Sequence, residues 1–177
     1  MLGIMSSKKE VGLYNIAYNL MEGSFFIPTI IMISIFPGLS KTKYFLSYFR
    51  KGVYLLTISG IFVGIVLFFL SEIIIHSFFA PEFQNAVGLL KILSYVIPFV
   101  FFGYLATQSL IALDQNKSFL IISILTLSIN VFLNFILIPN NGASGAALAT
   151  VITEALIALS CYILIKYHLS RSIKNVT

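Results

Sequence analysis

The sequence predicts an all-α bundle of membrane-spanning helices. A helix rises 1.5 Å per residue, so about 20 apolar residues cross a hydrocarbon core about 30 Å thick. Spanning β-strands would instead be about 10 residues long with strict alternation, a pattern that this chain lacks. Five apolar stretches are long enough to span as helices: residues 12–39, 52–75, 87–113, 118–138 and 144–165.

Composition supports the same fold class. Hydrophobic residues make up 59% of the 177 residues, charged residues only 10%, and the mean hydropathy is +1.01. A water-soluble fold of this composition would expose most of its apolar stretches to solvent. Membrane lipids are therefore the expected surroundings. Soluble enzymes and nucleic-acid-binding proteins are disfavoured, although the formal net charge is +5.

The first stretch carries a polar face near its middle. Spacings of four and three place Asn15, Asn19 and Glu22 on one side of the helix. An acidic residue at the centre of a span costs about 2.5–3.5 kcal/mol even on mild scales, so a proton, a partner or water must offset the charge. Glu22 either lines a water-filled path or is a protonated packing group. We expect it to matter more than any other single residue.

The second and third stretches carry packing and bending signals. Gly60 and Gly64, four residues apart, predict a close approach between two helices. Pro28 in the first stretch and Pro98 in the third each remove a helical hydrogen bond, which predicts a bend.

Lys91 lies about one turn inside the third stretch. Its ammonium group is placed to pair with Glu72 or Glu82, to attract an anionic substrate, or to reach the membrane surface along its own aliphatic stem. The sequence leaves these three interpretations open.

The fourth and fifth stretches are polar on one side. Asn130 and Asn134 continue a stripe that begins with Ser123 and Thr126, and they can hydrogen-bond a hydroxylated ligand or other helices. Glu154 lies deep in the fifth stretch, one turn after Thr150, and is a second buried carboxylate. Either role, substrate contact or packing, is compatible with this pattern.

The segment between these two stretches predicts a tight reversal. In "IPNNGAS", Pro139 ends one helix and Gly142 supplies the backbone freedom for the turn into the next. The fourth and fifth stretches should therefore pack antiparallel.

Basic residues gather at one side of the predicted bundle. They follow the first, third and fifth stretches, whereas residues 77–86 and 139–144 contain no Lys or Arg. By the positive-inside rule, we expect a multi-pass plasma-membrane protein with a cytoplasmic C-terminus and an exported N-terminus. The connector "KTKYFLSYFRK" interleaves aromatic and basic residues, which predicts an amphipathic segment at the cytoplasmic interface.

Catalytic and metal-binding motifs are missing from the sequence. There is no glycine-rich phosphate loop, no GxSxG and no Cys/His pairing, and His76 and His168 fall on opposite sides of the predicted membrane. We therefore expect no enzyme activity, no catalytic residue, no cofactor and no metal. Cys161 is expected to be a small buried residue without a redox role.

Three segments carry a family resemblance. "EVGLYNIAYNL", "IPTIIMISIFPGLSK" and "LIALDQNKSFLIISILTLSINVFLNFILIPNNGASGAALATVITE" resemble polysaccharide-biosynthesis flippases of the multidrug/oligosaccharidyl-lipid/polysaccharide exporter superfamily. The resemblance implies about five spans from the C-terminal six-helix half of a two-bundle transporter. It also implies alternating-access flipping of a polyprenyl-linked oligosaccharide. On this basis we expect the chain to form a single bundle, 1–177, that is a fragment of a longer transporter and requires a missing N-terminal half as its partner.

Two other functions stay open. One is a cation-coupled exporter of the related multidrug and toxin extrusion family, in which buried carboxylates exchange H⁺ or Na⁺ for an organic cation. The other is a non-transporting membrane scaffold that binds a glycosyltransferase or polymerase. If the chain belongs to a transporter, the residues that we expect in its substrate cavity are Asn15, Asn19, Glu22, Lys91, Asn130, Asn134 and Glu154.

Overall fold

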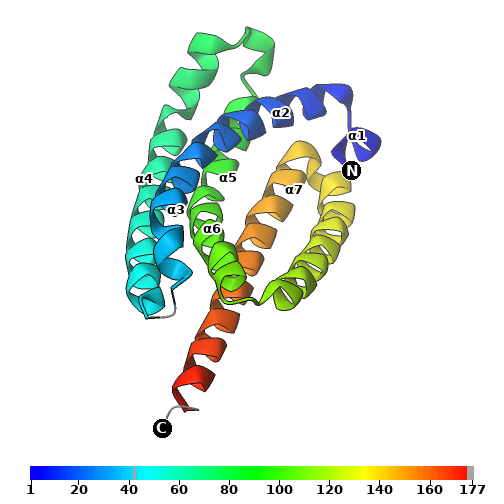
Figure 1. The fold of residues 1–177 in the computed structure, drawn as a ribbon. Helices are drawn as coiled ribbons and strands as arrows, with labels where there is room; N and C mark the ends of the chain where they lie inside the picture. The colour runs from blue at the N-terminus through cyan, green and yellow to red at the C-terminus, as the bar shows by residue number, and fades with distance from the viewer. Residues whose placement is uncertain (42, 175–177) are drawn as a thin grey trace.

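A computed structural model of the chain describes residues 1–41 and 43–174, with side chains described as far as residue 170 (Figure 1). Every regular element in these ranges is helical, so the all-α prediction is confirmed. The elements are α1 (Leu2–Met5), α2 (Lys8–Glu22), the 3-10 turn η1 (Gly23–Phe25), α3 (Phe26–Leu39), α4 (Phe45–Phe78), the 3-10 turn η2 (Pro81–Phe83), α5 (Ala86–Ser94), α6 (Ile97–Ala112) and α7 (Asn116–Lys174).

Several helices are long and apolar enough to cross a membrane. Three qualify individually: Lys8–Leu39, Phe45–Phe78 and Asn116–Ser170. The bent pair α5 and α6 qualifies as a fourth when it is taken as one span. The bundle is therefore polytopic, and the number of times that it crosses the bilayer stays a prediction.

Helix α7 reverses direction near its middle. Gly142 has φ 53° and ψ −133°, and the helices before and after it run side by side in opposite directions (Figure 1). We call residues 116–141 the first leg and residues 143–174 the second leg. The predicted hairpin with Pro139 before the turn and Gly142 at it is confirmed. Counted by legs, the helices correspond in position to the five predicted stretches.

The prolines lie next to the breaks in the other two segments. The axis bends by 43° between α5 and α6, where Pro98 cannot donate to the carbonyl of Ser94, the last residue of α5. Pro28 follows η1 in the same way, and Ser24 within that turn donates its hydroxyl to the Met21 carbonyl at 2.7 Å. Both prolines therefore interrupt their helices as predicted.

The glycine face of α4 packs against the bend between α5 and α6. A Cβ on Gly60 would lie 3.0 Å from the Pro98 Cα, and one on Gly64 would lie 2.9 Å from the Ser94 carbonyl oxygen. Side chains there would push the helices apart. The predicted close approach at Gly60 and Gly64 is confirmed, and it places α6 between α4 and α7 in the core.

The basic segments meet at one end of the bundle. The start of α4, the α6–α7 connection and the last described turns of α7 lie together at the lower end of Figure 1, whereas α1, η2 and the turn at Gly142 lie at the upper end. The predicted grouping of basic segments is thus present in the fold. We call this lower end the basic end.

The connector after α3 is continuous with the next span, because α4 begins at Phe45 and continues into the apolar stretch. Arg50 and Lys51 are exposed in its first turns, so the predicted amphipathic pattern is present, and its place at a membrane interface stays a prediction. Phe45 and Phe49, one helical turn apart, are buried and stack at 5.8 Å, so core packing extends the helix backwards. Residue 42 of the connector lies outside the described residues.

Candidate functional site

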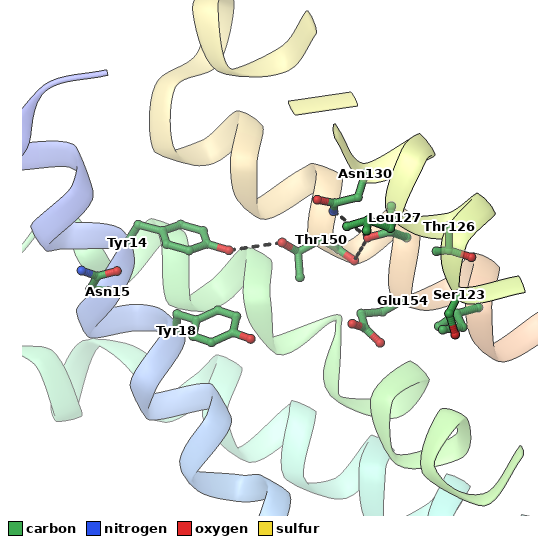
Figure 2. Close-up of a pocket in the computed structure, with 11 residues that line it drawn as sticks. Tyr14, Asn15, Tyr18, Ser123, Thr126, Leu127, Asn130, Thr150 and Glu154 are labelled. Atoms are coloured by element: carbon green, nitrogen blue, oxygen red, sulfur yellow. Dashed lines mark hydrogen bonds between the residues drawn. The ribbon is translucent and has the colours of Figure 1, made fainter. Parts of the chain in front are cut away.

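A polar cavity of about 560 Å³ lies between α2 and the two legs of α7 (Figure 2). Nine of its eleven lining residues carry a hydroxyl, amide or carboxylate group, in a bundle whose surface is otherwise largely apolar. The lining residues are Tyr14, Asn15, Tyr18, Ser123, Thr126, Leu127, Asn130, Thr150, Thr153, Glu154 and Ile157.

Two tyrosines of α2 form one wall. Tyr14 and Tyr18 lie four residues apart, stack with a centroid distance of 5.8 Å and point toward the second leg (Figure 2). The oxygens of Tyr14 and Thr150 are 3.2 Å apart. Because Thr150 donates its single hydroxyl proton to the Ala146 carbonyl at 3.0 Å, Tyr14 is the donor in this pair. This hydrogen bond fixes α2 against the second leg.

Asn130 of the first leg lies on the opposite side of the cavity. The Asn130 amide donates to the Thr153 hydroxyl at 3.0 Å, which joins the two legs (Figure 2). Asn134 donates to the side-chain oxygen and the carbonyl of Asn130, both at 2.9 Å. Asn134 therefore supports Asn130 from outside the cavity, and Asn130 itself lines it.

Glu154 occupies the junction of two cavities. It lines the polar cavity and also a second one of about 310 Å³ that extends toward α6, where Tyr104 and Thr107 contribute to the wall. The side chain is half-buried. Among the described residues no side chain donates a hydrogen bond to this carboxylate, and no Lys or Arg lines either cavity. Its oxygens are available to accept from a ligand or a proton.

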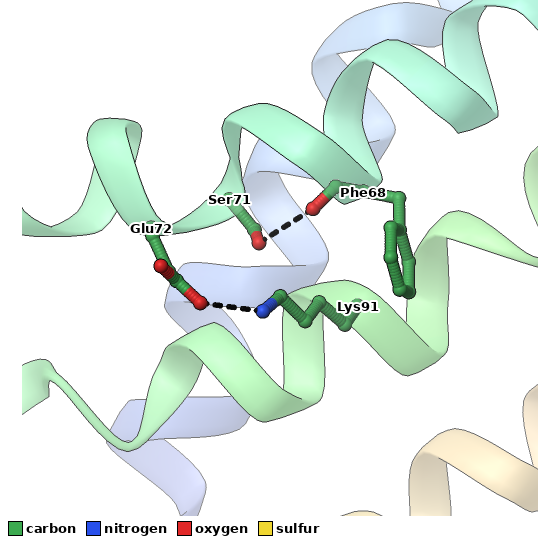
Figure 3. Close-up of polar contacts among 4 residues, drawn as sticks. All are labelled: Phe68, Ser71, Glu72 and Lys91. Atoms are coloured by element: carbon green, nitrogen blue, oxygen red, sulfur yellow. Dashed lines mark hydrogen bonds and ion pairs between the residues drawn. The ribbon is translucent and has the colours of Figure 1, made fainter.

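The remaining predicted site residues lie elsewhere. Asn15 lines the polar cavity, but Asn19 and Glu22 are exposed and line neither cavity. Lys91 is also outside. Its Nζ lies 2.6 Å from Oε1 of Glu72 on α4 and 5.7 Å from the Phe68 ring centroid (Figure 3). Of the two carboxylates that the sequence offered to Lys91, the structure selects Glu72.

Sequence reasoning missed three polar lining residues: Tyr14, Tyr18 and Thr153. The two tyrosines belong to the helix face next to the one that carries Asn15 and Asn19, one residue earlier in each turn. Tyrosine combines an apolar ring with a polar hydroxyl that seeks a hydrogen-bond partner when it is buried. Two tyrosines at i, i+4 were therefore the sequence signal for a second polar face on α2.

Glu10 was also missed, and it holds the turn at Gly142. Its carboxylate accepts from the Ala143 backbone N–H at 2.9 Å and from the Ser6 hydroxyl. Ala143 begins the second leg, so Glu10 caps that helix across the fold. Ser7 in turn accepts from the Glu10 N–H at 3.3 Å, and the S-x-x-E pattern at residues 7–10 was the readable signal.

In the part of the chain that the structure describes, no three His, Cys, Asp or Glu side chains lie close enough together to hold a metal ion. The cavity is instead a set of neutral donors and acceptors around one carboxylate. Such a lining suits hydroxyl-rich or cationic ligands better than anionic ones.

Comparisons with known proteins place the chain more closely. It is 33% identical over 162 residues to an uncharacterised membrane protein of Methanocaldococcus jannaschii. The match covers 89% of this chain and 39% of the relative. The chain is a membrane protein. It is also 30% identical over 164 residues to a protein named as a probable flippase, AglR of Haloferax volcanii, which covers 88% of this chain and 34% of that relative.

The chain thus spans little more than a third of the length of the curated relatives that it matches. No family model matches the chain. No solved structure matches it.

Proposed function

We propose that the chain is part of a transporter that moves a lipid-linked oligosaccharide across a membrane by alternating access. The polar cavity between α2 and the legs of α7 is the observation that carries the proposal. Similarity to a probable flippase over 88% of the chain supports it. The partner that completes the transport path is, in this proposal, the remaining half of the transporter.

The cavity lining favours the sugar portion of such a substrate. Tyr14, Asn130 and Thr153 already hydrogen-bond within the protein. Asn15, Tyr18 and Glu154 line the same cavity with amide, hydroxyl and carboxylate groups that no other described side chain engages, as sugar hydroxyls require. No described cation lines the cavity, and Lys91, which the sequence offered as an anion-binding group, is paired with Glu72. We therefore assign the glycan, not the pyrophosphate, to this cavity.

A cation-coupled multidrug exporter is the second candidate function. The observation that favours it is Glu154, a half-buried carboxylate at the junction of two cavities with no cation beside it in the described part of the chain. An organic cation, Na⁺ or H⁺ would supply the missing charge.

The functional test is a chimera in which this chain replaces the matched segment of the Haloferax volcanii relative. Proteoliposomes with the chimera are loaded either with a fluorescent polyprenyl-linked oligosaccharide or with a cationic dye. We expect the chimera to translocate the lipid-linked oligosaccharide and to leave the dye distribution unchanged. Dye export that depends on a proton or sodium gradient, without movement of the oligosaccharide, would favour the second candidate. If neither probe moves at normal expression, the result would favour a membrane scaffold that does not transport.

We also propose that the protein lies in the plasma membrane with the basic end in the cytoplasm. Gln84→Cys at the upper end and Ser172→Cys in the last turn of the second leg, each in a Cys161→Ser background, report the two sides. We expect an impermeant thiol reagent added to whole cells to label Gln84→Cys only. Labelling of Ser172→Cys without permeabilisation would reverse the orientation.

A further inference from the structure

A separate cavity of about 250 Å³ opens at the basic end, between the first turns of α4 and the last described turns of the second leg of α7. It shares no residue with the polar cavity. Residues spaced three and four apart on each helix supply its walls, so one face of each helix is turned toward it. The lining residues are Leu46, Phe49, Arg50, Val53, Tyr54, Tyr162, Lys166 and Leu169.

Two cations from different helices flank this cavity. Arg50 and Lys166 are both exposed, and the Lys166 Nζ lies 5.2 Å from the centroid of the Tyr162 ring. All six acidic side chains of the chain belong to described residues, and none lies within 4.0 Å of either cation. The two positive charges therefore meet at one cavity without a neutralising side chain.

The wall beneath the cations is apolar and aromatic. Leu46, Val53 and Leu169 contribute aliphatic surface, and the Phe49 and Tyr162 rings stack with centroids 6.4 Å apart. Arginine binds phosphate oxygens in a bidentate manner, and Lys and Arg near a membrane surface attract anionic lipids. A free phosphate would use the cations and leave the apolar wall unused, whereas a lipid uses both.

We propose that this cavity binds the phosphate head group of an anionic membrane phospholipid between Arg50 and Lys166, with the start of an acyl chain against Val53 and Leu169. The site couples α4 to the second leg at the basic end. It does not depend on the proposed transport function, because it is made of other residues.

A single introduced tryptophan tests the site, because the sequence contains none. Tyr54→Trp places the fluorophore at the rim of the cavity, where Tyr54 is 72% exposed. The variant is reconstituted into phosphatidylcholine vesicles with a minor fraction of phosphatidylglycerol. In one set only the phosphatidylglycerol chains are brominated near the head group; in the other, an equal amount of phosphatidylcholine is brominated. We expect brominated phosphatidylglycerol to quench more strongly, reporting its enrichment at the site.

Neutralising both cations should remove that preference. Each basic residue near a membrane surface contributes about fivefold in apparent affinity for an anionic lipid, so Arg50→Gln with Lys166→Gln should abolish the difference between the two sets. The matched control, Lys41→Gln with Lys117→Gln, changes the net charge equally at the same end but outside the cavity. We expect the control pair and the charge-conserving pair Arg50→Lys with Lys166→Arg to keep it.

Three results would overturn the proposal. Equal quenching by the two brominated lipids would show that no anionic lipid is enriched. An equal loss in the control pair would reduce the effect to general surface charge. Relief of quenching by excess soluble glycerol phosphate would assign the cations to a free phosphate compound instead of a lipid.

Discussion

Replacing Gly142 by alanine will destabilise the hairpin of α7 by several kcal/mol. A non-glycine residue in such a positive-φ conformation costs about 1–3 kcal/mol from backbone strain alone. The new Cβ would also fall on the Glu10 carboxylate, so the cap on Ala143 would be lost as well. Loss of a helix cap costs about 0.5–2 kcal/mol.

Thermal unfolding in detergent, followed by far-ultraviolet circular dichroism, measures this effect. Gly88→Ala is the matched control, because Gly88 is helical and a Cβ there meets nothing within 4 Å; we expect it to be neutral or slightly stabilising. Glu10→Ala separates the two causes. In that background Gly142→Ala should cost only the backbone part. An unchanged unfolding temperature for Gly142→Ala would mean that the turn at Gly142 is not part of the stable fold.

Glu154→Gln will reduce transport in the chimera by about ten- to a hundredfold at normal expression. A hydrogen bond to a charged group contributes about 1.5–3 kcal/mol, and the substitution keeps the size of the side chain while it removes the charge. Because Glu154 lines both cavities, a substrate or a coupling proton passing between them meets this carboxylate. The measurement is the initial rate of oligosaccharide translocation in proteoliposomes.

Glu22→Gln is the informative comparison. The sequence predicts that Glu22 is the dominant residue, whereas the structure places it on an exposed face outside both cavities. We now expect Glu22→Gln and Lys91→Gln to change the rate less than Glu154→Gln does. A larger loss in Glu22→Gln would restore the sequence-based prediction and would place the transport path along the exposed face of α2.

Much of the fold followed from local chemistry. Four features were signalled by residues that lie close together in the sequence. They are the span lengths, the bend at Pro98, the close approach at Gly60 and Gly64, and the reversal at Gly142. Which helix faces would lie against one another was harder to predict. Periodicity identified the stripe that contains Asn130, but it could not say which helix would face it or that Thr153 would accept its hydrogen bond.

The site was predicted in part for the same reason. The polar residues Asn15 and Glu22 predicted that their face of α2 lines the cavity. In the structure, the neighbouring face with Tyr14 and Tyr18 is turned toward α7. The two faces differ by one residue, about 100° around the helix. Only long-range contacts, such as Tyr14 with Thr150, decide between them.

The first leg of α7 forms one wall of the polar cavity and is little covered by the rest of the chain, with only 6% of its most apolar window buried. One helix, about 10 Å across with its side chains, therefore separates a cavity lined by polar residues from surroundings suited to hydrocarbon. A molecule with a sugar head and a long isoprenoid tail could straddle that helix, the head inside and the tail outside, without its tail entering water. In the proposed transport, such a molecule would need to move only its head past this one helix.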